Sequence, residues 1–382
     1  MAQLRTIGIA IIGTGLIGPR HAESVKRCAE ASLLCFVDPR LDVALVAEAF
    51  DSVPFFSSIQ QILETGCRPD AAIVCTPNST HVPVSQELFA AGIHVLVEKP
   101  IATDLESGRQ LLLAAEAAGK HLLVGHHRRF NPYVTATKRA LEQGSIGRLI
   151  AISGLWATCK PDSCFLPPTD WRAKSGTGGP ILINLIHEVD ILQYLMGPIV
   201  RVHAEQALSQ RGHAAEERAA ILMRFASGVV GTFILSDATP SMHNFESGTG
   251  ENPMIPQAGK DLYRIFGSEG TLSVGDMKLS SYGDAAKSWS NSLQEQTIPV
   301  GSEVPFDEQV RNFVRVVQGI AEPRCTGEDC LQALVVCDAV RRALDTGLPI
   351  EIDVSDLTKC WSRRALCLHL SAEDIQGAPR EA

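Results

Sequence analysis

Short apolar runs alternate with stretches of helical periodicity through the first third of the chain. The apolar runs, which predict strands, lie at 7–12, 33–37, 70–75, 94–97 and 121–124. The stretches that predict helices lie between them, at 18–29, 41–50, 82–91 and 105–118. Strands that are apolar throughout are typical of a parallel sheet with helices on both faces. The pattern therefore predicts an α/β domain, built on a doubly wound parallel sheet, over residues 1–130.

The pattern changes after residue 130. Further strands are expected at 149–155, 200–206, 217–225, 228–236, 263–266 and 270–274. Further helices are expected at 133–143, 181–195, 308–319 and 328–346. These elements predict an α+β domain over residues 131–354 with a largely antiparallel open sheet, followed by a C-terminal tail at 355–382. The Pro- and Gly-rich stretch 161–180 is too long for a plain connection, which makes it a candidate functional loop.

Composition excludes several classes of protein. The 382 residues are 45% hydrophobic and 20% charged, which is ordinary globular usage and argues against a disordered or collagen-like chain. The net charge of −9 and the pI near 5.7 give no overall attraction for nucleic acid or an anionic membrane, so neither is expected as a partner. No apolar run reaches the roughly 18 residues that a membrane-spanning helix needs.

Cysteine usage predicts a reduced, cytoplasmic protein. The 11 cysteines are scattered, several of them lie inside apolar runs, and no signal-peptide pattern opens the chain. Cys325 and Cys330 are close in sequence, but the two further ligands of a structural zinc site are missing, so no metal is expected.

A glycine-rich turn follows the first predicted strand and opens the first predicted helix. Gly13 permits the tight turn, Gly15 permits close approach of a pyrophosphate, and Gly18 permits close packing of helix on strand. The helix N-terminus then offers free N–H groups to phosphate. Asp38, about 20 residues on, is placed to bind the ribose hydroxyls. The turn therefore predicts dinucleotide binding, rather than merely a tight turn with an ordinary capping role.

The choice between cofactors depends on two side chains. Asp38 repels a 2′-phosphate and favours NAD, whereas Arg40 would attract that phosphate, so NADP stays open. A further candidate is Lys99, in the sequence Glu98-Lys99-Pro100, which follows the predicted strand 94–97. The carboxyl end of a strand in an open parallel sheet faces the ligand crevice. Lys99 is therefore expected in the site and not as an ordinary solvated loop charge.

Six ordered motifs across about residues 5–350 now point to one family. They are Gly13-Thr14-Gly15-Leu16-Ile17-Gly18, Thr76-Pro77-Asn78-Ser79-Thr80-His81, Glu98-Lys99-Pro100, Gly125-His126-His127-Arg128-Arg129-Phe130-Asn131-Pro132, Trp171-Arg172, and Gly178-Gly179-Pro180 through Asn184-Leu185-Ile186-His187-Glu188-Val189-Asp190. With these motifs the chain resembles the Gfo/Idh/MocA oxidoreductases, the family of glucose–fructose oxidoreductase and inositol 2-dehydrogenase.

The resemblance implies an N-terminal Rossmann domain that holds NAD(P) and a C-terminal domain that supplies part of the substrate pocket. It also implies that the exposed face of the second sheet packs against other copies, in a homodimer or homotetramer. The Lys99–Pro100 bond is commonly cis in this family. The residues expected to bind the cofactor are Gly13, Thr14, Gly15, Leu16, Ile17, Gly18, Asp38, Arg40, Thr76, Pro77, Asn78, His81, Glu98, Lys99, Trp171 and Arg172.

Alcohol oxidation also needs a group that takes the hydroxyl proton near the working pH, and histidine is suited to this. With the resemblance, His187 is expected to be that acid/base, while Lys99 stabilises the developing alkoxide. The alternative for His187 is a structural histidine on the inner face of an apolar helix. The residues expected to contact substrate are Lys99, Arg128, Asn184, His187 and Asp190.

The neighbours of His187 leave several roles open. Asn184 either orients the imidazole or binds a substrate hydroxyl, and Asp190 either accepts the other imidazole N–H or caps local structure. Arg128 either binds substrate or forms a structural ion pair. The inositol-dehydrogenase pattern has an Asp four residues before the His, but this chain has Ile183. That departure weakens both an inositol assignment and a simple Asp–His dyad.

The sequence therefore predicts an NAD(P)-dependent dehydrogenase that oxidises a secondary alcohol of a sugar, cyclitol or related polyhydroxylated ring. One alternative is a family member that holds NAD tightly and recycles it within one reaction cycle. Another alternative, from a different class, is a non-catalytic NAD(P)-binding sensor.

Overall fold

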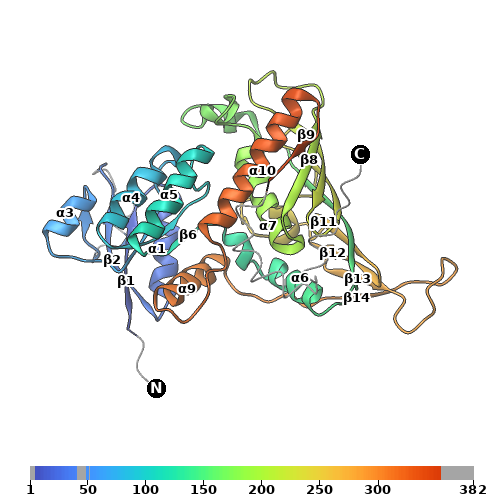
Figure 1. The fold of residues 1–382 in the computed structure, drawn as a ribbon, viewed down its shortest axis with the longest axis horizontal. Coiled ribbons are helices and arrows are strands. Elements are labelled where there is room, and N and C mark those ends of the chain that lie inside the picture. Colours follow the sequence, from blue (N-terminus) through green and yellow to red (C-terminus); the bar gives the residue numbers. More distant parts are fainter. Residues whose placement is uncertain (1–4, 41–48, 51, 354–382) are drawn as a thin grey trace. The chain divides into compact units, whose positions relative to one another are not determined.

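The structure, a computed structural model, describes residues 5–40, 49–50 and 52–353 (Figure 1). The predicted tail at 355–382 and nearly all of the predicted helix at 41–50 lie outside these residues. The chain divides into two compact units. The first takes in the described residues up to Phe130 and then Glu303–Leu334, and the second takes in Asn131–Ser302 and the described residues from Val335 onward.

The first unit contains a parallel sheet of six strands in the order β3-β2-β1-β4-β5-β6. These strands are β1 (Ile7–Ile12), β2 (Ala31–Val37), β3 (Phe55–Phe56), β4 (Ala71–Val74), β5 (His94–Val97) and β6 (Leu122–Val124). Every residue of β1 and of β4 is buried, because helices cover both faces of the sheet. The predicted doubly wound parallel sheet is confirmed.

Two apolar clusters form the core of this unit, one on each face of the sheet. Ile9 and Ile11 belong to one cluster, and Ala10 and Ile12 to the other, since successive side chains of a strand point to opposite faces. The helices of the unit are α1 (Gly18–Arg27), α3 (Ile59–Glu64), α4 (His81–Ala90), α5 (Leu105–Ala118), α9 (Pro305–Val317) and the first part of α10 (Gly327–Thr346), with 3-10 turns η1 (Asn78–Thr80) and η2 (His127–Phe130).

Helix α9 differs from the sequence-based expectation in the unit to which it belongs. The predicted boundaries place it in the second domain, but Val310 and Phe313 pack in the same cluster as Ile9 of the first sheet. In Figure 1 the orange helix α9 lies beside α1, although the two helices are nearly 300 residues apart in the sequence (Gly18–Arg27 and Pro305–Val317). An apolar stripe along a helix shows that one of its faces is buried, but it does not indicate which of the two sheets that face covers.

The second unit contains a sheet of nine strands in the order β14-β13-β12-β11-β7-β10-β9-β8-β15 within the described residues. These strands are β7 (Leu149–Ala157), β8 (Ile199–Glu205), β9 (Arg218–Phe225), β10 (Val230–Ser236), β11 (Tyr263–Gly267), β12 (Gly270–Val274), β13 (Lys278–Ser281), β14 (Gln294–Thr297) and β15 (Ile350–Glu351). Strands β7 and β10 pair in parallel, and the other neighbours are antiparallel. The largely antiparallel sheet is confirmed. Strand β14 is not predicted, because its four residues are polar and exposed and so form no apolar run.

Burial alternates along these strands, so the sheet has one buried and one exposed face. In β9, Ile221 and Met223 are buried, while Leu222 and Arg224 are exposed. The helices of this unit are α6 (Pro132–Glu142), α7 (Ile186–Met196), α8 (Phe245–Thr249) and the later part of α10, with 3-10 turns η3 (Asp162–Phe165) and η4 (Asp170–Ala173). Among the described residues, no helix has the length and apolar content to cross a membrane.

The predicted helix at 181–195 is not a single α-helix. Its first five residues, Ile181–Leu185 (η5), form a π-helix, and α7 begins at Ile186 and stops before Gly197. A π-turn shifts the side-chain register of a helix and is frequent at functional sites. The apolar pattern does not reveal it, because the apolar residues Ile181, Leu182, Ile183 and Leu185 are equally compatible with an α-helix.

Candidate active site

The glycine-rich turn joins β1 to α1 with the geometry that a dinucleotide needs. Gly13 has a φ of 95°, and a Cβ there would lie 2.8 Å from the carbonyl carbon of Cys75. A Cβ on Gly18 would lie 2.2 Å from the carbonyl oxygen of Gly13. By contrast, a Cβ on Gly15 would meet nothing within 4 Å, and Leu16 is fully exposed. The turn is packed tightly on its inner side and open on its outer side.

The N-terminus of α1 leaves its N–H groups available to such a ligand. Ile17 occupies the N-cap position, and no side chain caps the helix there. Free N–H groups at a helix start bind phosphate. The turn and the helix start therefore fit the pyrophosphate of a dinucleotide.

Asp38, at the end of β2, is held against this turn. Its Oδ2 accepts hydrogen bonds from Thr14 N at 2.9 Å and from Thr14 Oγ1 at 2.8 Å, and its Oδ1 accepts from Arg40 N at 3.0 Å. Burial alone raises the pKa of Asp38, but the hydrogen bonds from Arg40 and Thr14 outweigh burial and lower it to about 2. The carboxylate is therefore ionised at neutral pH. The Arg40 side chain is 75% exposed, so it can move to admit a ribose.

A second turn, after β4, contributes to the same end of the sheet. His81 is buried at the start of α4, with Nε2 2.9 Å from the carbonyl oxygen of Thr76 and Nδ1 2.7 Å from that of Pro100, and a neutral imidazole donates to one of the two. The hydroxyl oxygen of Thr76 is buried, and no residue in the described ranges bonds it. Pro77 and Asn78 form the exposed rim of this turn. A buried hydroxyl without a protein partner fits a bound cofactor.

The Glu98-Lys99-Pro100 turn follows β5 and rests on a buried ion pair. The carboxylate of Glu98 lies 2.7 Å from Nε2 of His21, which extends from α1 and is fully buried. The other carboxylate oxygen accepts the backbone N–H of Lys99 at 3.2 Å, and the Lys99–Pro100 bond is cis, as the resemblance implies. The His21–Glu98 pair therefore holds the backbone of the turn that carries Lys99. No sequence motif pointed to His21.

The electrostatics of this pair are set by burial and by nearby positive groups. Burial alone raises the pKa of Glu98, but the hydrogen bond and charge of His21 outweigh it and lower the pKa to about 2. A Cβ on Gly125 would lie 2.9 Å from the Glu98 carboxylate, so only glycine fits beside it. His21 in turn packs edge-on against Phe306, at the start of α9, with ring centroids 5.1 Å apart.

The paired arginines after β6 are both buried. Arg129 donates to Asp329 Oδ2 at 2.9 Å and to the carbonyl of Arg324 at 2.8 Å, which gives it a structural ion pair. Arg128 is 4% exposed on η2. A structural role for one arginine of this motif is therefore shown by its contacts, and a substrate contact stays a prediction for Arg128.

In the second unit, His187 is the second residue of α7 and is 6% exposed. Asp190, one turn later, is fully buried. Glu188 lies next to His187 in sequence and accepts a hydrogen bond from the hydroxyl of Tyr263 on β11. Ile183 lies in the π-turn, so no carboxylate occupies the position four residues before His187.

Asn184 has a partner that no sequence motif indicated. Its Oδ1 accepts a hydrogen bond from Lys160 Nζ at 2.8 Å, and Lys160 also lies 3.4 Å from Asp237 Oδ2. Lys160 follows β7 and Asp237 follows β10. Only the pairing of these two strands shows that the residues meet, because their positions in the sequence are far apart.

Trp171 and Arg172 lie on η4, in the loop that the sequence marks as functional. Trp171 is 37% exposed, and the guanidinium of Arg172 lies 5.7 Å from the centre of its ring. The Nε of Arg172 is buried without a hydrogen-bond partner among the described residues. A buried guanidinium N–H of this kind is suited to an anionic or polar ligand.

Two family matches cover most of the chain. Residues 7–126 match "Oxidoreductase family, NAD-binding Rossmann fold", and residues 138–352 match "Oxidoreductase family, C-terminal alpha/beta domain". The chain belongs to the Gfo/Idh/MocA oxidoreductase family. It is an NAD-binding oxidoreductase, and the predicted family, enzyme class and cofactor are thereby confirmed, with NADP still open.

Individual members of the Gfo/Idh/MocA family are similar over about three quarters of the chain or more. An inositol 2-dehydrogenase of Rhizobium meliloti (strain 1021) is 25% identical over 348 residues, which are 89% of this chain and 97% of that protein. A 1,5-anhydro-D-fructose reductase of Ensifer adhaerens is 29% identical over 290 residues, 74% of this chain and 80% of that protein. The WlbA dehydrogenase of Bordetella pertussis, solved with NADH and UDP-GlcNAcA, has a TM-score of 0.72 at 23% identity and covers 91% of this chain and 98% of that chain. The last likeness shows the fold.

The predicted site residues of this Gfo/Idh/MocA chain fall into two groups. The glycine turn, Asp38, the 76–81 turn, Lys99 and Arg128 belong to the first unit, and Trp171, Arg172, Asn184, His187 and Asp190 belong to the second. The first group offers a place for phosphate and ribose at the carboxyl end of a parallel sheet. The second group offers polar and cationic side chains around the start of α7.

Proposed function

We propose that this enzyme oxidises a secondary alcohol of a sugar, cyclitol or related polyhydroxylated ring. Relatives named for inositol and anhydrofructose support this substrate class. NAD, when bound, accepts the hydride that leaves the carbinol carbon. The residues that would hold it are the glycine turn, Asp38 on the ribose and the 76–81 turn. The observation that carries the proposal is the Lys99 turn, held by the buried His21–Glu98 pair at the carboxyl end of β5.

We propose that Lys99 and His187 handle the hydroxyl proton. The O–H bond of the substrate breaks as the carbon loses hydride, the proton passes to the imidazole of His187, and the product is a ketone. The Lys99 ammonium stabilises the alkoxide that develops at the oxygen. Arg128, Asn184 and Asp190 are proposed to contact the substrate or to orient these groups. Trp171 and Arg172 are proposed to lie near the cofactor.

The test is the formation of NADH or NADPH, followed at 340 nm, with a panel of cyclitols, aldoses and sugar acids and each cofactor in turn. Turnover of one ring polyol with added NAD supports the proposal. Silence across the panel, with NAD found in the purified protein, favours the internally recycled cofactor. If no compound is turned over, and the purified protein contains no NAD but binds NAD that is added, the result favours a non-catalytic sensor.

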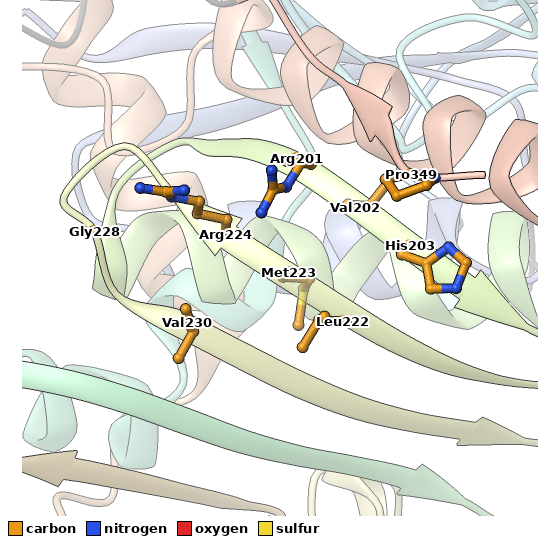
Figure 2. Close-up of a pocket in the computed structure, with 9 residues that line it drawn as sticks. All are labelled: Arg201, Val202, His203, Leu222, Met223, Arg224, Gly228, Val230 and Pro349. Atoms are coloured by element: carbon orange, nitrogen blue, oxygen red, sulfur yellow. The ribbon is translucent and has the colours of Figure 1, made fainter. Parts of the chain in front are cut away.

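We propose that copies of this chain associate through the exposed face of the second sheet. Leu222, Val230 and Ile234 lie on this face with 53%, 49% and 46% of their surface exposed. Leu222 and Val230 line a shallow hollow of about 410 Å³ on neighbouring strands β9 and β10 (Figure 2). Exposed apolar side chains gathered on one sheet face are typical of an interface between subunits.

The change Leu222→Asp should convert a dimer or tetramer into a smaller species, because a carboxylate buried in an apolar interface is left unpaired. The mass is measured by light scattering after size-exclusion chromatography. Leu113→Asp is the matched control, since Leu113 is 64% exposed on α5 in the first unit. A monomeric wild type, or an unchanged mass for the variant, contradicts this interface.

We also propose that the protein acts in the cytoplasm. Nine cysteines in the part of the chain that the structure describes are free thiols. Burial raises the pKa of Cys35 to about 12, which makes that thiol unreactive. A redox-sensitive reporter fusion in cells tests the compartment.

A further inference from the structure

Two strand ends in the second unit bring a lysine and an aspartate together. Strands β7 and β10 pair in parallel, from Val230 opposite Ala151 to Ser236 opposite Ala157. The backbone therefore leaves the sheet at the same edge after each of the two strands. Lys160 N donates to the carbonyl of Asp237 at 2.9 Å, which fixes the backbone just beyond the two strand ends. The Lys160 side chain is thereby directed to the start of the helix that carries His187, where it meets Asn184.

The surroundings of the Lys160 ammonium are mostly shielded from water. Its side chain is 16% exposed, with Nζ 2.8 Å from Asn184 Oδ1, 3.4 Å from Asp237 Oδ2 and 5.5 Å from the centre of the Trp156 ring. An ammonium has three N–H donors, and these contacts use two of them. Asn184 accepts through its oxygen, so its amide nitrogen keeps two further donors beside the ammonium.

The charges around Lys160 leave an excess of positive charge. Asp237 is shared between Lys160 and Arg211, whose NH1 lies 2.7 Å from Asp237 Oδ1. The carboxylate of Glu217 does not offset the excess, because it is bonded by Arg218 and by backbone N–H groups. Glu216 Oε1 accepts the backbone N–H of Ile181 at 3.1 Å, so this carboxyl group is engaged by the backbone of the π-turn.

Two further observations agree with this excess. Burial lowers the pKa of Lys160, Asp237 partly offsets that effect, and the positive charge of Arg172 lowers the pKa again. The Nε of Arg172 is buried and lacks a protein partner among the described residues. Cationic side chains that are shielded from water and keep unused N–H donors are stabilised when an anion binds to them.

We propose that Lys160 and Asn184 bind a carboxylate of the substrate, and that the substrate is therefore a polyhydroxylated acid such as an aldonate or uronate. One ammonium N–H and one amide N–H, side by side, match the two oxygens of a single carboxylate. A carboxylate carries one negative charge, which matches the single positive charge left over when Lys160 and Arg211 share Asp237. The inference rests on the proposed oxidation of a polyol, because Asn184 lies one turn before His187.

The test compares Lys160→Met with wild type on aldonates and uronates and on neutral polyols of matched stereochemistry. The variant should lose kcat/KM for the acids by at least about tenfold more than for the neutral compounds, mainly through KM, since a binding contact is removed. Lys160→Arg should recover part of the loss. Lys174→Met is the matched control, because Lys174 lies in the same loop but is 63% exposed and paired with Asp170.

Calorimetric binding of the acids to the NAD-loaded protein separates this inference from the proposed function. Acids that bind wild type tightly and Lys160→Met at least about tenfold more weakly support the inference even if no compound turns over. Equal losses for acids and neutral compounds, a preference for neutral polyols, or tighter binding of sugar phosphates than of sugar carboxylates would overturn it. If Lys160→Met does not fold, Lys160→Gln and Asn184→Leu serve in the same comparison.

Discussion

The two units of this chain hold their site charges in opposite ways. In the first unit the two site carboxylates, Asp38 and Glu98, have pKa values near 2 because their own neighbours donate to them. In the second unit the cations of Lys160 and Arg211 share one carboxylate, Asp237. A unit whose charges are satisfied internally is suited to a ligand that it binds through backbone N–H groups and ribose contacts. A unit with unbalanced charge is suited to a ligand that brings the missing charge.

The first unit also carries Lys99, the ammonium proposed to act on the substrate, and the strongest test removes it. Lys99→Ala should lower kcat by about 10²–10³, the usual cost of losing a group that stabilises an oxyanion, while NAD still binds. Stopped-flow turnover and fluorescence titration with NADH measure the two effects. Lys120→Ala is the control, because Lys120 precedes β6 and so lies toward the amino end of the parallel sheet. Retained turnover in Lys99→Ala removes Lys99 from the mechanism.

The second test removes the proposed base of the second unit. His187→Ala should lower kcat/KM by about 10²-fold and flatten its dependence on pH between 5 and 8, since no group with a suitable pKa then takes the proton. A pH profile that keeps its wild-type shape argues against His187 as the base. His121→Ala is the matched histidine control, because His121 is exposed just before β6, toward the amino end of the parallel sheet.

The third test concerns the buried pair beneath the Lys99 turn. His21→Leu should destabilise the protein by about 3 kcal/mol, because it removes the side-chain partner of the buried Glu98 carboxylate. The same variant should lower kcat more than it changes KM, since the Lys99 backbone loses its support. Urea unfolding and steady-state kinetics measure the two effects. Unchanged kinetics in a variant that is less stable would reduce His21 to a structural role.

The pair also predicts how stability depends on pH. The folded state lowers the pKa of Glu98 from 4.5 to about 2, so it favours the ionised form, and the stability gained is fully present above pH 4.5. That stability is lost as the pH falls from 4.5 through about 2. Glu98→Gln should make the loss less steep, and Asp38 should account for part of what remains. Urea unfolding from pH 6 to 2.5 measures the slope, and an unchanged slope contradicts the assignment.

The smallest expected effect concerns the choice of cofactor. Asp38→Asn should raise KM for NAD and reduce the preference for NAD over NADP by about tenfold, because the charge that repels a 2′-phosphate is removed and Arg40 is released toward it. Kinetics with both cofactors measure the ratio. A wild type that already prefers NADP would reverse the role given to Arg40.

The sequence by itself determined the features that depend on neighbours in the chain. Gly13, Gly15 and Gly18 lie within a single strand–turn–helix, and their spacing sufficed to predict a dinucleotide turn because the geometry of such a turn is local. The continuous apolar strands likewise sufficed to predict a parallel sheet with both faces covered.

Only the tertiary structure decided which distant residues meet. Nothing in the sequence joins His21 to Glu98, which are 77 positions apart, or Lys160 to Asp237, which meet because β7 and β10 pair in parallel. It also decided that α9 packs on the first sheet and that a π-turn precedes His187. Periodicity identifies a face that must be buried, but the partner of that face and the register of a buried helix depend on packing across the whole fold.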